Sequence, residues 1–336
     1  MSKKLKKIVC FGGGNAMPKA VLTGLKKYPC EIFTTVSMLE SGGSSGQLRV
    51  DFKTLSWGDL RRHLLALSEA PEWKKKIFQL RVGREIFDDG HVGHPFGNIF
   101  LAGLELFAKN LKEAIKIAHE FLEVKDHVLP LTVEFAHIYG ILENGEVIFG
   151  EDEIDVPKKH NPKLKIKEIH LSKKIKAYPP TLNAIKKADL IIIGPGDLYS
   201  SLIPCFLPEG AKKAIQKSKA KKILIVNPMT KLGETNDFSV LDFANEVEKY
   251  MGCELDYVIY NNQIPSRARI KNYKKEHPEL LDLVKIDKNL DKKKPAPYRT
   301  KGSGAGFIGK NLLVKSGPII YDSKKVVKAI FNLCKR

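Results

Sequence analysis

The 336-residue sequence has few cysteines, no long apolar run and fewer acidic than basic side chains, and each of these features narrows the class of protein. The five cysteines are an odd number without Cys-x-x-Cys spacing, which argues against a disulfide framework and a zinc site and is typical of a reducing compartment. No apolar run approaches the ~20 residues that cross a bilayer. The charged start, Met1 to Leu5, leads directly into a predicted strand and lacks the features of a signal peptide. We therefore expect a cytoplasmic protein.

Acidic residues are in the minority: 57 lysines and arginines against 38 aspartates and glutamates give a net charge of +19. Such a charge first suggests a polyanionic partner, such as nucleic acid, an anionic membrane or a phosphorylated ligand. The lysines are scattered, however, in pairs and triplets such as 74–76 and 292–294, at predicted helix ends and strand starts. We expect most of them to form a solvated surface, which disfavours nucleic acid and membranes as partners.

Short apolar runs alternate with helical segments along most of the chain. Continuous apolar strands that alternate with helices are typical of a parallel sheet covered on both faces. The predicted fold class is therefore α/β, a Rossmann-like, doubly wound and mostly parallel sheet (α/β/α). The predicted strands are 7–11, 32–36, 189–193, 222–226 and 255–260, and the predicted helices are 19–27, 59–67, 110–123, 182–187 and 240–249.

Two stretches depart from this alternation inside what we predict to be a single large domain, 1–336. Residues 129–171 contain short alternating segments around Asn144-Gly145, a strong signal for a hairpin, and predict an antiparallel β insertion. Residues 287–306 are rich in lysine, proline and glycine and predict a long mobile loop.

Glycine-rich segments follow three of the predicted strands. In open α/β sheets, ligands bind beyond the carboxyl ends of the strands, where backbone N–H groups favour phosphate. The first segment, Gly12-Gly13-Gly14-Asn15, precedes a helix that begins near Pro18. It is neither Gly-x-Gly-x-x-Gly nor a Walker loop, so a tight strand-to-helix turn explains it as well as a phosphate site does.

The second segment, 42–49, is more specific. It offers the amide of Gly43, the hydroxyls of Ser44 and Ser45 and the guanidinium of Arg49, a set suited to a diphosphate. The third, 194–197, repeats Gly-Pro-Gly-Asp after a later strand, where a turn and helix cap is the alternative. Two such segments at one sheet edge favour a nucleotide-type ligand.

Between these segments lie two further candidates. The segment His91–Asn98 is interpreted as a loop because of its glycines, and its His94 and Asn98 could bind metal, act in acid–base chemistry or donate to phosphate. In Trp57–Arg62, Asp59 is a predicted helix cap, and the two arginines at 61 and 62 could reach an anion.

This ordered series of motifs resembles the gluconeogenesis-factor proteins of bacteria, which are related to 2-phospho-L-lactate transferase, an enzyme that makes a deazaflavin coenzyme. The resemblance implies a Rossmann-like fold, a cytoplasmic setting and a nucleotide-type ligand at the carboxyl edge. In the gluconeogenesis-factor branch the implied ligand is a uridine diphosphate sugar, and the role is regulation of growth and cell shape on gluconeogenic carbon. The matching segments are 12–14, 42–49, 58–61, 91–98, 101–104, 129–130, 194–204 and 227–235.

In the transferase branch, the resemblance implies transfer of a phospholactyl group from a guanosine diphospho-donor to a deazaflavin, with a divalent metal. Two departures bear on this choice. Family members usually carry an Asp-Asp pair where this chain has Glu40-Ser41, which weakens a Mg²⁺ site. Residues 15–18, Asn-Ala-Met-Pro, stand where a Thr-Gly is common.

The leading hypothesis is a regulatory protein that binds a nucleotide sugar, and no metal is required for it. The diphosphate would lie on the amides of Gly12, Gly13, Gly14, Asn15, Gly194 and Gly196, with contacts from Gly43, Ser44, Ser45 and Arg49, while Asn98 and Asn227 would read the base or ribose. The alternative is a phosphoryl-group transferase in which Glu40 and Asp197 share Mg²⁺ and His94 steadies the phosphate.

Two other functions are disfavoured. A dehydrogenase is disfavoured because the first loop lacks the dinucleotide fingerprint. An RNA-binding protein would lose affinity steeply with salt. A protein partner and a homo-oligomer are left open.

Overall fold

A seven-stranded, all-parallel sheet forms the centre of the computed structural model, which describes residues 5–86, 92–288, 290 and 305–333. The strand order is β14-β12-β10-β9-β1-β2-β5. The chain therefore winds outward from β1 in both directions, and the α/β class predicted from the apolar runs is confirmed. The strands of this sheet are β1 (Lys6–Phe11), β2 (Cys30–Val36), β5 (His127–Pro130), β9 (Leu190–Ile193), β10 (Lys221–Ile225), β12 (Tyr257–Asn261) and β14 (Gly306–Lys310).

Helices cover both faces of this sheet, because the inner strands are apolar on both sides. In β1, Ile8 and Cys10 belong to one hydrophobic cluster and Val9 and Phe11 to the other, and all four are buried. The first cluster includes side chains of α3 (Gly58–Leu67), α6 (Leu111–Phe121) and α12 (Ser323–Leu333). The second includes side chains of α8 (Pro179–Lys187), α9 (Ala211–Lys217) and α10 (Val240–Met251).

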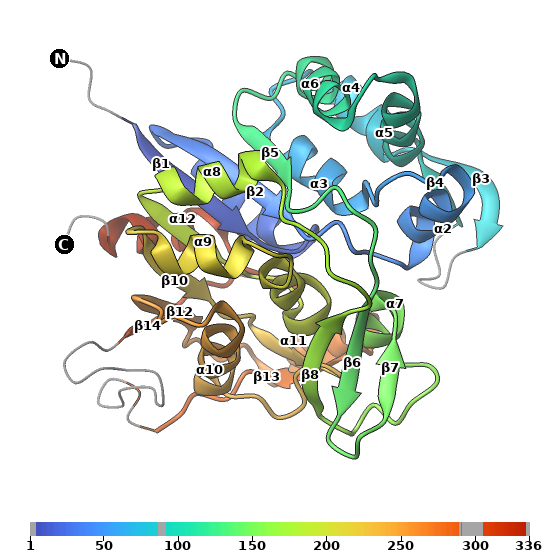
Figure 1. Ribbon diagram of the computed structural model, residues 1–336. Coiled ribbons are helices and arrows are strands. Elements are labelled where there is room, and N and C mark those ends of the chain that lie inside the picture. Colours follow the sequence, from blue (N-terminus) through green and yellow to red (C-terminus); the bar gives the residue numbers. More distant parts are fainter. Residues whose placement is uncertain (1–4, 87–91, 289, 291–304, 334–336) are drawn as a thin grey trace.

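The remaining helical segments connect these layers or gather at the ends of the molecule, with α4 and α5 beside α6 in Figure 1. They are η1 (Pro18–Leu22), α1 (Thr23–Leu25), α2 (Gly43–Phe52), α4 (Glu72–Gln79), α5 (Phe96–Phe107), α7 (Glu151–Asp155), η2 (Leu198–Leu202), η3 (Ile203–Phe206) and α11 (Arg267–Glu276). Among the described residues, no helix is both long and apolar enough to cross a membrane.

Three small antiparallel sheets accompany the large one. Strands β6 (Ile138–Leu142), β7 (Val147–Phe149) and β8 (Ile166–Leu171) form a unit visible in Figure 1, and Gly145 makes the turn between β6 and β7 at a φ of 87°. This unit lies within the stretch 129–171 where an insertion is predicted, although residues 129–130 still belong to β5 of the large sheet. The other pairs are β3 (Arg81–Ile86) with β4 (Val92–Pro95), and β11 (Met229–Lys231) with β13 (Leu280–Leu283).

The second glycine segment and the segment around His94 have regular secondary structure, so the interpretation of both as loops is wrong. Residues 43–49 form the first turns of helix α2, and its cap residue Gly42 has an extended backbone. The segment expected to be a loop around His94 is strand β4, followed at once by α5, which begins at Phe96 after Pro95. His91 and most of the predicted mobile loop 287–306 lie outside the described residues.

Candidate functional site

The first and third glycine segments meet at the point where the sheet changes winding direction. They follow β1 and β9, which are adjacent parallel strands, so their carboxyl ends open at the same edge. A Cβ atom on Gly196 would lie 2.7 Å from the backbone nitrogen of Gly13, so the close approach of the two segments requires glycine there. Gly12 to Gly14 are buried, whereas Asn15 is exposed. The two segments therefore lie at one edge of the sheet, and binding of a phosphate by their amides stays a prediction.

Asn227, two residues after the neighbouring strand β10, holds the third segment in place. Its side-chain oxygen accepts a hydrogen bond from the Gly196 N–H at 3.0 Å, and its side-chain nitrogen donates to the Gly196 carbonyl at 2.9 Å. Both ends of the amide are therefore used to position the 194–197 segment. A contact of Asn227 with a base or ribose stays a prediction.

Helix α2 brings the second segment to the same region, and its N-terminus carries a chain of polar contacts. The Ser44 hydroxyl oxygen lies 2.9 Å from Nδ1 of His94 and accepts a hydrogen bond from the Asn98 amide at 3.0 Å. The Asn98 side-chain oxygen in turn accepts from Nε of Arg61 at 2.7 Å. A hydroxyl oxygen can accept two hydrogen bonds, so the tautomer of His94 decides whether Nδ1 donates to Ser44 or accepts its proton. When Nδ1 carries the proton, the serine proton is left for a ligand.

A small cavity adjoins this chain of contacts. It has a volume of about 100 Å³ and brings together five of the predicted residues with acidic and basic neighbours. The lining residues are Glu40, Gly42, Gly43, Ser44, Ser45, Arg62, Arg81, Pro95, Asn98, Glu151, Asp152, Asp155, Val156 and Lys158. A larger cavity of about 750 Å³ lies between β8, α9 and α10, and its lining includes no predicted site residue.

Glu40 lies against the start of α3. It is the one acidic residue of Glu40-Ser41, the pair at which related proteins usually carry two aspartates. It accepts a hydrogen bond from the Ser56 hydroxyl at 3.1 Å, and a Cβ atom on Gly58 would lie 2.6 Å from its Oε2. Burial and the charge of Asp59 raise the pKa of Glu40 to about 7, against the opposing effects of Arg62 and the serines. Burial likewise raises the pKa of Glu151 well above its usual range.

Asp59 and Arg61 differ from the roles expected for them. Trp57 precedes α3 without a side-chain cap, and Asp59 lies in the first turn, where it forms an ion pair with Arg62 at 2.8 Å. Arg61 is buried and directs its guanidinium to Asn98 and to the Phe78 carbonyl. Arg62 is therefore the arginine of this pair that lines the cavity.

Arg49, expected to contact a diphosphate, is bonded to backbone carbonyls of the protein. Its guanidinium donates to the backbone carbonyls of Glu40, at 3.2 Å, and Ala136, at 2.5 Å, and it lies over the ring of Phe135. Only 7% of the residue is exposed. These contacts favour a role in fixing the segment before α2, and a direct contact with a ligand stays a prediction.

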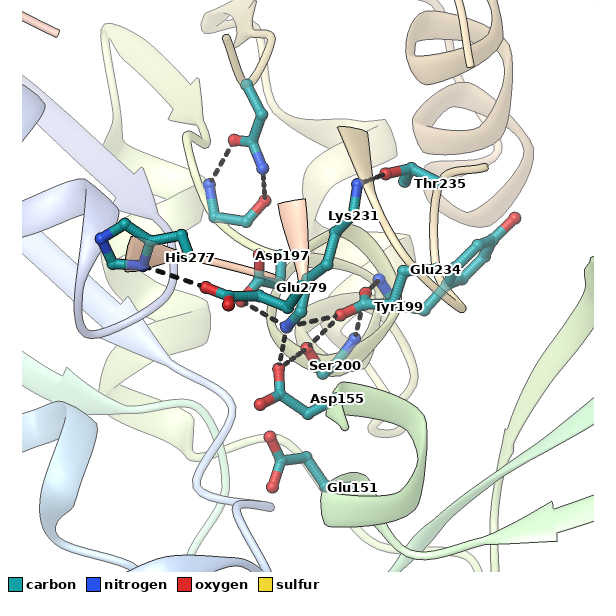
Figure 2. Close-up of polar contacts among 12 residues, drawn as sticks. Glu151, Asp155, Asp197, Tyr199, Ser200, Lys231, Glu234, Thr235, His277 and Glu279 are labelled. Atoms are coloured by element: carbon teal, nitrogen blue, oxygen red, sulfur yellow. Dashed lines mark hydrogen bonds and ion pairs between the residues drawn. The ribbon is translucent and has the colours of Figure 1, made fainter. Parts of the chain in front are cut away.

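A second polar cluster, which sequence reasoning missed, surrounds Lys231 (Figure 2). The ammonium forms ion pairs with Asp155, with Asp197 at 3.1 Å and with Glu234 at 3.2 Å. Asp197 was a candidate for sharing Mg²⁺ with Glu40, but its neighbours here are Asp155 and Glu234. The signal available in the sequence was the conjunction of Lys231 and Glu234 in the segment 227–235.

These features define the chain as a doubly wound α/β protein with a polar site at the carboxyl ends of the strands around its topological switch point. Comparison with known proteins identifies the family within this class. The model of the 2-phospho-L-lactate transferase CofD family matches residues 8–301, and the chain belongs to this family.

Several relatives of the chain carry the name gluconeogenesis factor or putative gluconeogenesis factor. The putative gluconeogenesis factor of Thermotoga maritima is 37% identical over 278 residues, which are 82% of this chain and 85% of that protein. The gluconeogenesis factor of Bacillus subtilis is 30% identical over 337 residues, 98% of each chain. A crystal structure of a UPF0052 family protein from Bacillus halodurans has a TM-score of 0.85 at 31% identity and covers 98% of this chain and 100% of that one. The resemblance seen in the motifs is confirmed.

Proposed function

We propose that the protein binds a nucleotide sugar of the uridine diphosphate type and acts as a cytoplasmic regulator of carbon metabolism, growth and cell shape. The regulatory part rests on the likeness to gluconeogenesis factors. The binding part rests on the site, and the observation that carries it is the N-terminus of α2 with Ser44 held by His94 and Asn98.

The start of α2 has the properties of an anion site. The helix is ten residues long, and its first-turn N–H groups have no acceptor within the helix. The cap residue Gly42 contributes no side-chain bond, so these donors are left for a ligand or solvent. The helix dipole adds a partial positive charge at the same place. The hydroxyls of Ser44 and Ser45 supplement the amides, and the diphosphate is the part of the ligand that fits these donors.

The charge around the cavity is compatible with this assignment in spite of its carboxyl groups. Three cationic side chains, Arg62, Arg81 and Lys158, belong to the lining. The raised pKa values of Glu40, about 7, and of Glu151 reduce the negative charge of the lining near neutral pH, and the protonated form of each acid can donate to a phosphate oxygen. Without these raised pKa values, the carboxylates of the lining would repel a doubly charged ligand more strongly.

The size of the cavity limits what it can hold. Ligand pockets typically measure about 300–1,000 Å³, whereas this cavity measures about 100 Å³. It therefore takes the phosphate groups alone. We assign the nucleoside and the sugar to the open edge beside it, over the glycine segments at Gly12–Gly14 and Gly194–Gly196.

A calorimetric titration tests the binding. Uridine diphosphate glucose and uridine diphosphate N-acetylglucosamine are titrated into the protein in EDTA and again in Mg²⁺, with guanosine diphosphate as the comparison. We expect a uridine diphosphate sugar to bind in EDTA and to raise the melting temperature as its concentration exceeds its Kd. Binding of guanosine diphosphate alone, and only with Mg²⁺, would contradict the proposal.

The variant Ser44→Ala tests whether the ligand binds at the N-terminus of α2. Loss of one hydroxyl that bonds a charged phosphate should weaken binding by about 10-fold. The matched control is Ser316→Ala, because Ser316 is exposed and lies outside the cavity. Equal affinity of the two variants would move the diphosphate away from α2.

The alternative, transfer of a phospholactyl group to a deazaflavin, is favoured by the family model. In that function Glu40 and Asp197 would share Mg²⁺ and His94 would steady the phosphate. Glu40 bonds to Ser56, while Asp197 pairs with Lys231, so these two carboxylates have separate partners. Formation of the deazaflavin product from a guanosine diphospho-donor would establish the transferase.

A further inference from the structure

The ammonium of Lys231 occupies the middle of three carboxylates, those of Asp155, Asp197 and Glu234 (Figure 2). One oxygen of each carboxylate lies within 4.8 Å of the others, a spacing that could hold a metal ion. The side chain of Lys231 is only 9% exposed. Burial by itself lowers the pKa of this ammonium, but the three carboxylates together raise it well above its usual range, so it stays charged.

Two of the three carboxylates, those of Glu234 and Asp155, are also held by groups other than Lys231. Glu234 accepts hydrogen bonds from the backbone N–H groups of Tyr199, at 2.7 Å, and Ser200, at 3.1 Å. The Ser200 hydroxyl lies 3.0 Å from Glu234 and 3.1 Å from Asp155. The arrangement of acceptors therefore depends on η2 and α7 as well as on the lysine, and we expect it to persist when the ammonium is removed.

The chemistry of the ammonium matches its surroundings. A lysine ammonium is a compact charge with three N–H donors, and here each of three carboxylates provides an acceptor. Oxygen ligands of this kind also suit Mg²⁺ and Mn²⁺. A divalent cation and the ammonium would compete for the same oxygens, and the lysine is tethered to strand β11.

We propose that Lys231 is a built-in replacement for a divalent cation, which makes binding in the adjoining cavity independent of metal at this cluster. The consequence for the ligand rests on the proposed function, since Asp155 belongs both to the cluster and to the lining of the cavity. The family's divalent metal therefore does not fit the Asp155–Asp197–Glu234 set in this chain.

Mn²⁺ binding to the full-length protein, followed by electron paramagnetic resonance, tests the replacement without any nucleotide. Lys231→Gln removes the charge and keeps a polar side chain of similar length. We expect this variant to bind Mn²⁺ at least ten-fold more tightly than the wild type, and its melting temperature to rise with Mn²⁺. The charge-conserving control Lys231→Arg should show no gain. Adding Asp155→Asn to Lys231→Gln should abolish the gain.

Two results would overturn the proposal. One is a folded Lys231→Gln protein, by circular dichroism, that binds Mn²⁺ no better than the wild type. The other is Mn²⁺ bound by the wild type and lost in Asp155→Asn. The comparison of the wild type with Asp155→Asn keeps Lys231 in place, so it tests the proposal even if Lys231→Gln fails to fold. A gain of Mn²⁺ without any binding of uridine diphosphate sugars would sustain this inference and refute only the proposed function.

Discussion

The hydroxyl oxygen of Ser44 lies 2.9 Å from Nδ1 of His94, 50 positions further along the chain, and Asn98 donates to the same oxygen. Strand β4 and the start of α5 place the histidine and the asparagine beside the N-terminus of α2. The contact joins two motifs that are separate in the sequence, and it fixes the orientation of the serine that we assign to the diphosphate.

Replacement of Asn98 by alanine should destabilise the protein. Asn98 is buried and is the acceptor for Nε of buried Arg61, so the variant leaves a charged donor without that partner. We expect a loss of about 1–3 kcal/mol in the free energy of unfolding, measured by urea denaturation. The control is Asn262→Ala at an exposed position, which should change stability little. Unchanged stability of Asn98→Ala would show that Arg61 finds another acceptor at no cost.

The variant Arg49→Ala separates a positioning role from ligand contact. It removes the charged donor that bonds the carbonyls of Glu40 and Ala136, so we expect a loss of roughly 1.5–3 kcal/mol in the free energy of unfolding. Ligand affinity should fall because the segment before α2 loosens. Full stability together with lost affinity would instead identify Arg49 as a ligand contact, and denaturant unfolding beside calorimetry distinguishes the two outcomes.

Gly14→Ala should disturb the first glycine segment. The added Cβ would lie 2.8 Å from Cα of Asp59, a backbone atom of α3 that no rotation of a side chain can move away. We expect reduced stability and weaker binding of a uridine diphosphate sugar. The matched control is Gly103→Ala, in α5, where a Cβ meets nothing within 4 Å and should stabilise by about 0.4–1 kcal/mol. Equal melting temperatures for the two variants would contradict the close packing at Gly14.

The pH dependence of the protein's stability should reveal the raised pKa of Glu40. Its pKa rises from 4.5 to about 7 on folding, so the folded state holds this proton more tightly than the unfolded state. The resulting contribution to stability is present at pH 4.5 and below, and it is lost as the pH rises through about 7. Glu40→Gln removes this loss, and the variant should gain in melting temperature over the wild type at pH 8 more than at pH 5. An identical difference at both pH values would refute the shift.

The continuous apolar strands made the large sheet predictable. Runs such as 190–193 and 223–226 are apolar throughout because both of their faces are buried, and no amphipathic alternative fits them. Gly12–Gly14 and Gly194–Gly196 could be placed at one sheet edge for the same reason, since parallel strands end on the same side.

Helix α2 was not predictable by the same reasoning. Its first residues, Gly43 to Gly46, have low helix propensity and read as a loop. A Cβ atom on Gly46 would lie 1.9 Å from the Ser41 carbonyl oxygen, so the glycine lets the chain before the helix pack closely against its first turn. Here packing outweighs local propensity.

The sequence by itself determined the α/β class, the parallel sheet and the family, because these follow from local apolar patterns and from motifs read in order. Only the tertiary structure decided which polar groups face one another. Lys231 meets Asp155 across 76 positions, and the Arg49 guanidinium meets the Ala136 carbonyl across 87. Such pairings depend on how distant elements pack, since a charged side chain that becomes buried must find its counter-charge or acceptor wherever the fold brings one near.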